Sequence, residues 1–267
     1  MRVIKVLAPC DPEVHLYKVG DEHTGTKHHA ARELAKTVER IRADPVARWI
    51  GMGDKCEFIT PSDPRWDGGA ICDWVSPDNI AIDQCDYYCD VMAPIADKCD
   101  GLLWGNHEYE IRRHSHIDVQ KYICKKLGVQ DLSFQAWIHY TFKSTATQTT
   151  GIDVIVTHGA GSARTRGAKM NRLEWLMNAF GGDIFGHGHM HDVILHPGMP
   201  YLVVTRDGKL KQKRKMGAVT GCYFRTYTQD VESSYGEQKN YPPTIIGSPM
   251  FRIAIDKNAN ATISVTA

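Results

Sequence analysis

The run Leu102-Leu103-Trp104-Gly105-Asn106-His107-Glu108 decides how the rest of the chain is interpreted. An apolar segment typical of a buried strand ends at a glycine, which permits a sharp turn. The turn then presents an amide, an imidazole and a carboxylate in succession. These groups can bind a metal ion, transfer a proton and orient a neighbour. The tetrapeptide alone also fits an ordinary polar turn, so its meaning depends on the other segments of the chain.

Four further segments place groups of the same kind close to the ends of predicted strands. They are Asp21-Glu22-His23, Gly53-Asp54, His158-Gly159 and Gly188-His189-Met190-His191. Together with Asn106 they supply seven candidate metal ligands: Asp21, His23, Asp54, Asn106, His158, His189 and His191. One divalent ion cannot use seven protein ligands and leave room for a substrate, whereas two ions that share a carboxylate can. Asp54 is the natural bridge, because both of its oxygens are free to bind.

The ligand types indicate which metals and which reaction to expect. Nitrogen and oxygen donors without sulfur suit two divalent ions such as Mn, Fe or Zn, and do not select among them. Two ions about 3.5–4 Å apart can hold a bridging hydroxide and the phosphoryl oxygens of an ester during in-line attack. His107 is then the expected catalytic residue, which stabilises developing charge or protonates the leaving oxygen. Glu108 is expected to fix the tautomer of His107 from behind.

Composition places the chain among ordinary globular proteins. Its 267 residues are 42% hydrophobic and 24% charged, and this length allows one large domain or two small ones. The net charge of +1 means that nucleic-acid binding would require local basic patches. No apolar run approaches the roughly 20 residues of a membrane span, and the N-terminal apolar stretch is too short for a signal peptide. We therefore expect a cytoplasmic protein without a membrane partner.

The eight cysteines allow two interpretations. Free thiols are favoured, because the chain is long, lacks a signal peptide and contains no CxxC pair. A zinc site at Cys85, Cys89 and Cys99 is the alternative.

The periodicity along the chain predicts an α/β protein. Residues 2–8 and 14–19 are strand-like and predict an antiparallel hairpin, while 26–43 has helical spacing and 46–52 is the next strand. A strand, a helix and a strand in this order predict a βαβ unit, which places ligand sites at the carboxyl ends of its strands.

The rest of the chain continues this pattern and then changes. Helices are expected over 80–96, 117–126 and 170–180, and strands over 132–143 and 152–157. Residues 57–79 form a long irregular insertion, which is typical of functional or lid-like loops. From about residue 193 the pattern becomes β-rich, with a hairpin signal at Asp207-Gly208. No clean boundary divides the chain, so we expect one domain over residues 1–267.

As a set, the motifs resemble the calcineurin-like metallophosphoesterase superfamily, closest to its compact bacterial and phage members. That family's pattern is Asp-x-His, Gly-Asp, Gly-Asn-His-Asp/Glu, His and Gly-His-x-His, and it is matched over roughly residues 14–192. The resemblance implies a four-layer α/β/β/α sandwich with two mixed β-sheets. It also implies a first metal on Asp21, His23 and His191, and a second on Asn106, His158 and His189. Asp54 would bridge the two ions, and His107 would be catalytic.

Basic residues near these motifs bear on the substrate. Arg113, Arg164 and Arg166 follow predicted ligands, so they are expected to line the phosphate entrance, with solvated surface charge as the alternative. The basic run 209–215 suits either a nucleic-acid backbone or an edge strand protected by lysines. We expect a phosphodiesterase acting on nucleotide or nucleic-acid substrates. A phosphomonoesterase, including a protein phosphatase, is the first alternative, and a non-catalytic metal-binding scaffold is the second.

Overall fold

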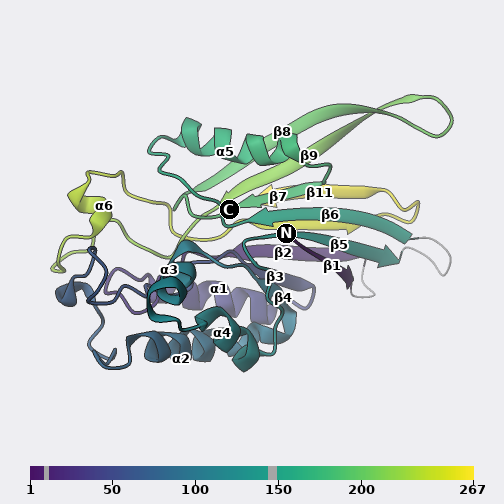
Figure 1. Cartoon of the computed structure of the whole chain (residues 1–267). Helices are drawn as coiled ribbons and strands as arrows, with labels where there is room; N and C mark the ends of the chain where they lie inside the picture. Colours follow the sequence, from purple (N-terminus) through teal and green to yellow (C-terminus); the bar gives the residue numbers. More distant parts are fainter. Residues whose placement is uncertain (9–11, 144–148) are drawn as a thin grey trace.

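Two β-sheets lie face to face, with helices on their outer faces (Figure 1). The computed structural model describes residues 1–8, 12–143 and 149–267. One sheet has six strands in the order β1-β5-β6-β7-β9-β8, and the other has five in the order β11-β10-β2-β3-β4. Each sheet contains parallel and antiparallel pairs, so both are mixed, as predicted.

The elements have the following bounds. The six-stranded sheet contains β1 (Arg2–Leu7), β5 (Gln135–Lys143), β6 (Thr149–Thr157), β7 (Ile184–His187), β8 (Val193–Val204) and β9 (Leu210–Thr220). The five-stranded sheet contains β2 (Glu13–Val19), β3 (Ala47–Gly51), β4 (Cys99–Leu102), β10 (Met250–Ile255) and β11 (Ala261–Thr266). The helices are α1 (Ala31–Ala43), α2 (Ile80–Met92), α3 (Asn106–Ser115), α4 (Val119–Leu127), α5 (Arg166–Ala179) and α6 (Tyr235–Gln238). Two short 3₁₀ helices are η1 (Gly68–Ala70) and η2 (Ala93–Lys98).

Three hydrophobic cores separate the four layers. Between the sheets, Leu16 of β2 and Ile138 of β5 belong to one buried cluster. On the outer face of the five-stranded sheet, Trp49 of β3 packs within a cluster that includes α1, α2 and α4. On the outer face of the other sheet, Phe185 of β7 packs with Leu173 of α5. The layers are therefore helix, sheet, sheet and helix, which is the predicted α/β/β/α sandwich.

Parallel pairing brings the carboxyl ends of the central strands to one edge. Strands β2, β3 and β4 are parallel neighbours, and α1 connects β2 to β3 as the predicted βαβ unit. In the other sheet, β6 and β7 are parallel neighbours. The segments that follow parallel strands emerge at the same edge of a sheet, which is where open α/β folds place their sites.

The predicted hairpin between the first two strands is wrong. β1 pairs in parallel with β5 in the six-stranded sheet, whereas β2 pairs with β10 and β3 in the other. β2 is buried along most of its length and needs a neighbour on each side. A local turn signal does not specify such partners, because pairing is decided by burial of the whole strand.

Three helix starts also differ from the sequence prediction. α1 begins at Ala31 rather than at residue 26, so His28 and His29 precede the helix instead of lying in its first turn. The turn after β4 becomes α3, which starts at Asn106 itself. α5 starts at Arg166, four residues before the expected position, because the Thr165 hydroxyl accepts a hydrogen bond from the Ala168 N–H as an N-cap.

The C-terminal part contributes strands to both sheets. β8 and β9 form the hairpin predicted at Asp207-Gly208, and β9 carries most of the basic run. β9 is not an edge strand, because it lies between β7 and β8. Cys222 and Phe224, within the β-rich part expected from about residue 193, make isolated bridges outside the named strands. Cys85 and Cys89 are buried free thiols in α2, and Cys10 lies outside the described residues.

Among the described residues, no helix has both the length and the hydropathy to cross a bilayer.

Candidate metal centre

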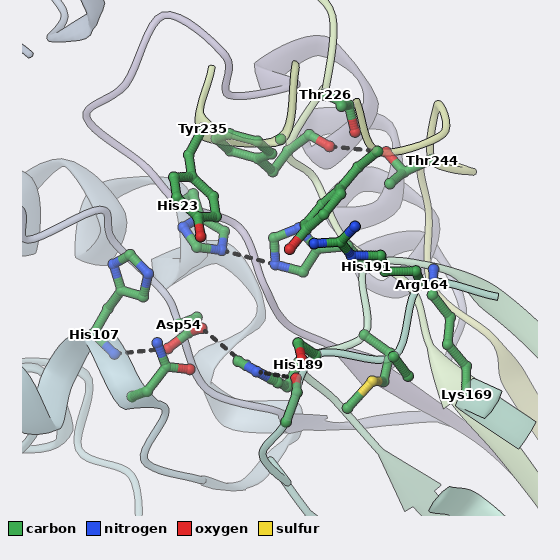
Figure 2. Close-up of a pocket in the computed structure, with 18 of the residues that line it drawn as sticks. His23, Asp54, His107, Arg164, Lys169, His189, His191, Thr226, Tyr235 and Thr244 are labelled. Atoms are coloured by element: carbon green, nitrogen blue, oxygen red, sulfur yellow. Dashed lines mark hydrogen bonds and ion pairs between the residues drawn. The ribbon is translucent and has the colours of Figure 1, made fainter. Parts of the chain in front are cut away.

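Five loops at the shared sheet edge bring the predicted ligands together (Figure 2). Each loop follows a parallel strand, and the seven side chains are distributed over them. The loops after β2, β3, β4, β6 and β7 carry Asp21 and His23, Asp54, Asn106, His158, and His189 and His191 respectively. The sheet topology thus brings together residues that are far apart in the sequence.

The ligand atoms form two overlapping groups. In the first, Asp21, Asp54, His158 and His189 each offer an atom within 4.8 Å of the others. The Oδ1 atom of Asn106 joins this group, because it lies 3.0 Å from Nε2 of His158. The second group is Asp21, His23 and His191, with the same mutual limit of 4.8 Å.

Three imidazoles are each held by a hydrogen bond at one ring nitrogen. His158 donates from Nδ1 to the Met52 carbonyl at 2.7 Å. His189 donates from Nε2 to the Gly161 carbonyl at 3.1 Å. His23 places Nδ1 2.7 Å from a carboxylate oxygen of Glu57. In each ring the other nitrogen is directed toward other candidate ligands, which is how metal-ligating histidines are usually oriented.

Unsatisfied polar atoms remain inside this arrangement. Among the described residues, Oδ1 of Asp21 and Nδ1 of His189 are buried without a hydrogen bond. The Nε2 atoms of His23 and His191 lie 3.1 Å apart (Figure 2). If both of these nitrogens were unprotonated, their lone pairs would repel each other. Buried polar atoms without partners are costly. A divalent cation would satisfy all of them, so these residues fit such an ion.

Five of the seven candidate ligands have a left-handed backbone conformation. Their φ angles are 52° for Asp21, 47° for His23, 52° for Asp54, 67° for His189 and 47° for His191. Residues other than glycine rarely adopt positive φ, and such strain concentrates at functional sites. Backbone hydrogen bonds between two of the loops hold this shape, from the Asp21 N–H to the Gly53 carbonyl and from the His23 N–H to the Asp54 carbonyl.

The glycines of the motifs are required by close contacts. A Cβ atom on Gly105 would lie 2.1 Å from Oδ1 of Asp54. A Cβ atom on Gly53, which has φ of 94°, would lie 2.7 Å from Nδ1 of His158. Neither contact is sterically possible without moving a candidate ligand, so both glycines shape the centre.

Asp54 and His158 are both buried and stabilise each other's charge. Burial alone would raise the pKa of Asp54, but His158 and His107 hold it well below its usual range. Burial alone would lower the pKa of His158, but the neighbouring Asp54 raises it to about 10. Without a cation, His158 is therefore protonated near neutral pH. A metal ion bound to His158 would have to displace that proton, which would be released to solvent.

His107 has a defined orientation beside the centre. Its Nδ1 atom donates to the Glu57 carbonyl, and its backbone N–H donates to Oδ1 of Asp54 at 2.9 Å. The carbonyl can only accept, so Nδ1 carries a proton and Nε2 remains for a substrate. The side chain lines the pocket at the metal centre.

Glu108 does not orient His107, contrary to the prediction. Its carboxylate accepts from the backbone N–H groups of Asp54, Lys55 and Gly105 at 3.0, 2.8 and 2.7 Å. It also pairs with the buried Lys55 ammonium at 3.1 Å. Because Glu108 lies in the first turn of α3, its side chain turns back to that helix start. It therefore joins the loops that carry Asp54 and Asn106.

The sequence prediction missed Glu57, which contacts both His23 and His107. Its carboxylate binds the ring of His23, and its carbonyl accepts from the ring of His107. Burial would raise its pKa, but His23 and His107 lower it to about 2, so it is ionised. The signal was its position three residues after Asp54, on the same loop.

We expect Glu57→Ala to weaken divalent-metal affinity by about 10–100-fold, the usual cost of losing the partner of a ligating histidine. The reason is that His23 loses the carboxylate that holds its ring. Glu57→Gln is the matched control, because its amide oxygen can still accept from His23 and should preserve most of the affinity. Titration calorimetry with Mn²⁺ measures both variants. Equal affinity of Glu57→Ala and the unmodified protein would contradict this role.

The pocket has a volume of about 370 Å³ and includes only some of the predicted basic residues. Arg164 lines it, and so do Lys169 and Arg65. Arg113 does not line the pocket; it lies exposed on α3 near Glu110. Arg166 also lies outside, where it donates to the Val193 carbonyl. Arg113 lies in the last turn of α3, and Arg166 is the first residue of α5. The directions in which these helices run relative to the pocket could not be predicted from the sequence.

Comparisons with known proteins give only remote similarities. No family model and no curated protein sequence matches the chain. A predicted phosphoesterase from Streptococcus pneumoniae has 10% identity and a TM-score of 0.35, with 95% of this chain and 98% of that chain covered. The NAD nucleotidase of Haemophilus influenzae has 10% identity and a TM-score of 0.44; the match covers 94% of this chain and about half, 49%, of that one. Vps29 of Chaetomium thermophilum has 10% identity and a TM-score of 0.40, with 95% and 96% covered.

The four-layer arrangement and the cluster of Asp and His side chains are those that the resemblance of the sequence motifs implies. At these identities and TM-scores, the solved structures do not identify an activity or a substrate for this chain. Any functional conclusion therefore depends on the side chains of the centre itself.

Proposed function

We propose that the chain is a divalent-metal-dependent phosphoesterase that holds two ions and hydrolyses phosphate esters. The supporting observation is the pair of overlapping ligand groups at one sheet edge, with a correctly oriented histidine beside them. Asp21, His23 and His191 would hold one ion, and Asn106, His158 and His189 the other. Asp54 lies next to His158 and His189 and would contact both ions.

The side chains divide the work of the reaction. When bound, the metal ions supply Lewis acidity and a nucleophile at neutral pH. In its doubly protonated form, His107 is placed to donate the Nε2 proton to the leaving oxygen and to return to the neutral ring, which keeps its Nδ1 proton on the Glu57 carbonyl. Arg164 lines the same pocket and offers positive charge to the ester. Lys169 also lines it, and its ammonium pairs with Asp192 at 3.3 Å. The buried ligands would hold the ions in fixed positions, so little rearrangement is needed.

A phosphodiester substrate is favoured over a monoester. The pocket continues beyond the metal ligands to Phe224, Tyr235 and Tyr241, which leaves space for a second organic group on phosphorus. The diesters that we propose as substrates are nucleotide esters with a second organic group on phosphorus, and nucleic acids. We propose Mn²⁺ as an effective metal. A phosphomonoesterase is the alternative, since the same ligand set would serve either ester.

Hydrolysis of two model esters tests this proposal. We expect bis(p-nitrophenyl) phosphate to be hydrolysed with a higher kcat/KM than p-nitrophenyl phosphate in the presence of Mn²⁺. Chelation of the metal should abolish both activities, and added Mn²⁺ should restore them. A preference for the monoester would support the alternative. If the metal-loaded protein hydrolysed neither ester, the proposal would be overturned in favour of a non-catalytic metal-binding scaffold.

A further inference from the structure

The pocket at the metal centre has a second half that the metal ligands do not explain. We call Phe224, Tyr235, Tyr241 and Pro242 the aromatic half; these residues line the same cavity as His107, His189 and His191. Its volume of about 370 Å³ is in the range of roughly 300–1,000 Å³ typical of small-molecule sites. Figure 2 shows Tyr235, His23 and Arg164 around this common space. A ligand in the cavity can therefore contact the centre and the aromatic half together.

The two tyrosines offer different surfaces to such a ligand. Their ring centroids are 6.3 Å apart and the rings are nearly perpendicular, at 88°. Lys239 lies over the Tyr235 ring at 5.6 Å and is not among the residues that line the cavity. Tyr235 itself lines the cavity and is 53% exposed, so its ring is accessible to a ligand. Tyr241 instead carries the Arg164 guanidinium over its ring at 5.1 Å.

The segment that carries the tyrosines is held in place by its own hydrogen bonds. The Ser234 hydroxyl donates to the Thr226 carbonyl at 2.6 Å, and the Tyr241 N–H donates to the Gly236 carbonyl at 2.8 Å. Arg225 ties the segment to the body of the protein through Glu33 at 2.6 Å. The rings are thus positioned before a ligand arrives, which reduces the ordering cost of binding.

The charges around the cavity favour an anionic ligand. Among the described residues, its basic lining residues are Arg65, which pairs with Asp63, Lys169, which pairs with Asp192, and Arg164, which lies over the Tyr241 ring. Its acidic lining residues are Asp54 and Glu57. Both acids interact with histidines of the centre, so no carboxylate lies free in the aromatic half. Flat aromatic rings stack on tyrosine, and arginine adds a cation–π or phosphate contact.

We propose that the aromatic half is a base-binding subsite for nucleoside phosphate esters. The base stacks on Tyr235 with its edge toward Tyr241, while Arg164 offsets the charge of the phosphate placed at the metal centre. This inference rests on the proposed function for the reacting phosphate, but base binding can be measured without turnover. The nucleoside can belong to a free nucleotide ester or to the end of an oligonucleotide, since both present the same base and phosphate.

Kinetics with two esters of p-nitrophenol test the subsite. With Mn²⁺ present, we expect a higher kcat/KM for thymidine 5′-(p-nitrophenyl phosphate) than for methyl p-nitrophenyl phosphate. Tyr235→Leu should lower this ratio by about tenfold, as loss of one base–aromatic stack does elsewhere. Tyr235→Phe keeps the ring and should keep the ratio. Tyr122→Leu, which removes an exposed tyrosine outside the pocket, is the control and should also keep it.

Binding of thymidine to the metal-free protein provides a readout independent of hydrolysis. Calorimetry should show binding to the unmodified protein and about tenfold weaker binding to Tyr235→Leu. Equal ratios and equal thymidine binding for these two proteins would overturn the subsite, even if bis(p-nitrophenyl) phosphate is still hydrolysed. Ring-dependent thymidine binding without hydrolysis of any ester would instead overturn the proposed function and leave the subsite standing. A thymidine oligonucleotide assayed in parallel distinguishes a polymer end from a free nucleotide ester by its relative kcat/KM.

Discussion

Replacement of Asp54 by alanine is expected to remove bound metal and to reduce phosphoesterase activity to the level of the uncatalysed background. The carboxylate is buried, lies 3.2 Å from Nε2 of His158 and 4.0 Å from Nδ1 of His189, and is the group that both proposed ions would share. Its loss would leave Asp21 as the one carboxylate among the candidate ligands to offset divalent charge in a buried site, which is unfavourable. Elemental analysis of the purified variant, together with hydrolysis of bis(p-nitrophenyl) phosphate, measures both effects.

Two further variants separate this result from general damage to the fold. Asp54→Asn keeps the shape of the side chain but removes its charge, and it should also lose metal. Asp86→Ala removes an exposed carboxylate on α2 that pairs with Lys126 and should retain both metal and activity. A normal metal content in Asp54→Ala would show that the shared ligand is another residue, with Asp21 the first to examine because it belongs to both ligand groups.

Replacement of His107 by alanine should leave metal binding intact while it lowers kcat by about 10²–10⁴-fold, the usual contribution of a general acid or base. The ring contributes no ligand to either group in which we place the ions, and its Nδ1 atom is already engaged by the Glu57 carbonyl. The backbone N–H that contacts Asp54 is unaffected by the substitution. The bridging carboxylate should therefore keep its position.

The matched control for this variant lies on the same helix. His114 is exposed near the end of α3 and pairs only with Glu110, so His114→Ala should preserve activity. An additional comparison uses esters with leaving groups of different pKa. Loss of a proton donor should affect poor leaving groups more than p-nitrophenol, which leaves readily as an anion. Unchanged kcat for His107→Ala on every ester would remove His107 from the mechanism.

The sequence predicted most of the strands and the clustering of the candidate ligands because both follow from short-range rules. Apolar strands that end in polar turns are recognisable locally, and parallel strands must deliver their ends to a common edge. The convergence of Asp21, Asp54 and His158, which are distant in sequence, needed only this topology. The four-layer order followed from the resemblance and is present in the three hydrophobic cores.

The features that the sequence did not predict depend on long-range contacts. Pairing of β1 with β5 joins residues more than a hundred positions apart, and no turn motif encodes it. Glu57 and Glu108 both lie close in sequence to candidate ligands. The directions of their side chains in the folded chain decide which of them contacts His23, and that residue is Glu57. The aromatic half comes from residues 224–242, which have no regular pattern apart from the short α6, and its relation to the centre appears only in the folded chain.

The left-handed backbone at five of the candidate ligands has a consequence for how ions enter and leave. Each such residue costs on the order of 1 kcal/mol, which the surrounding fold sustains whether or not a cation is present. Loading the protein therefore requires little further movement of the main chain. Exchange of one divalent species for another should then proceed without unfolding of the loops, so the cellular supply of each metal would decide which ions the protein carries.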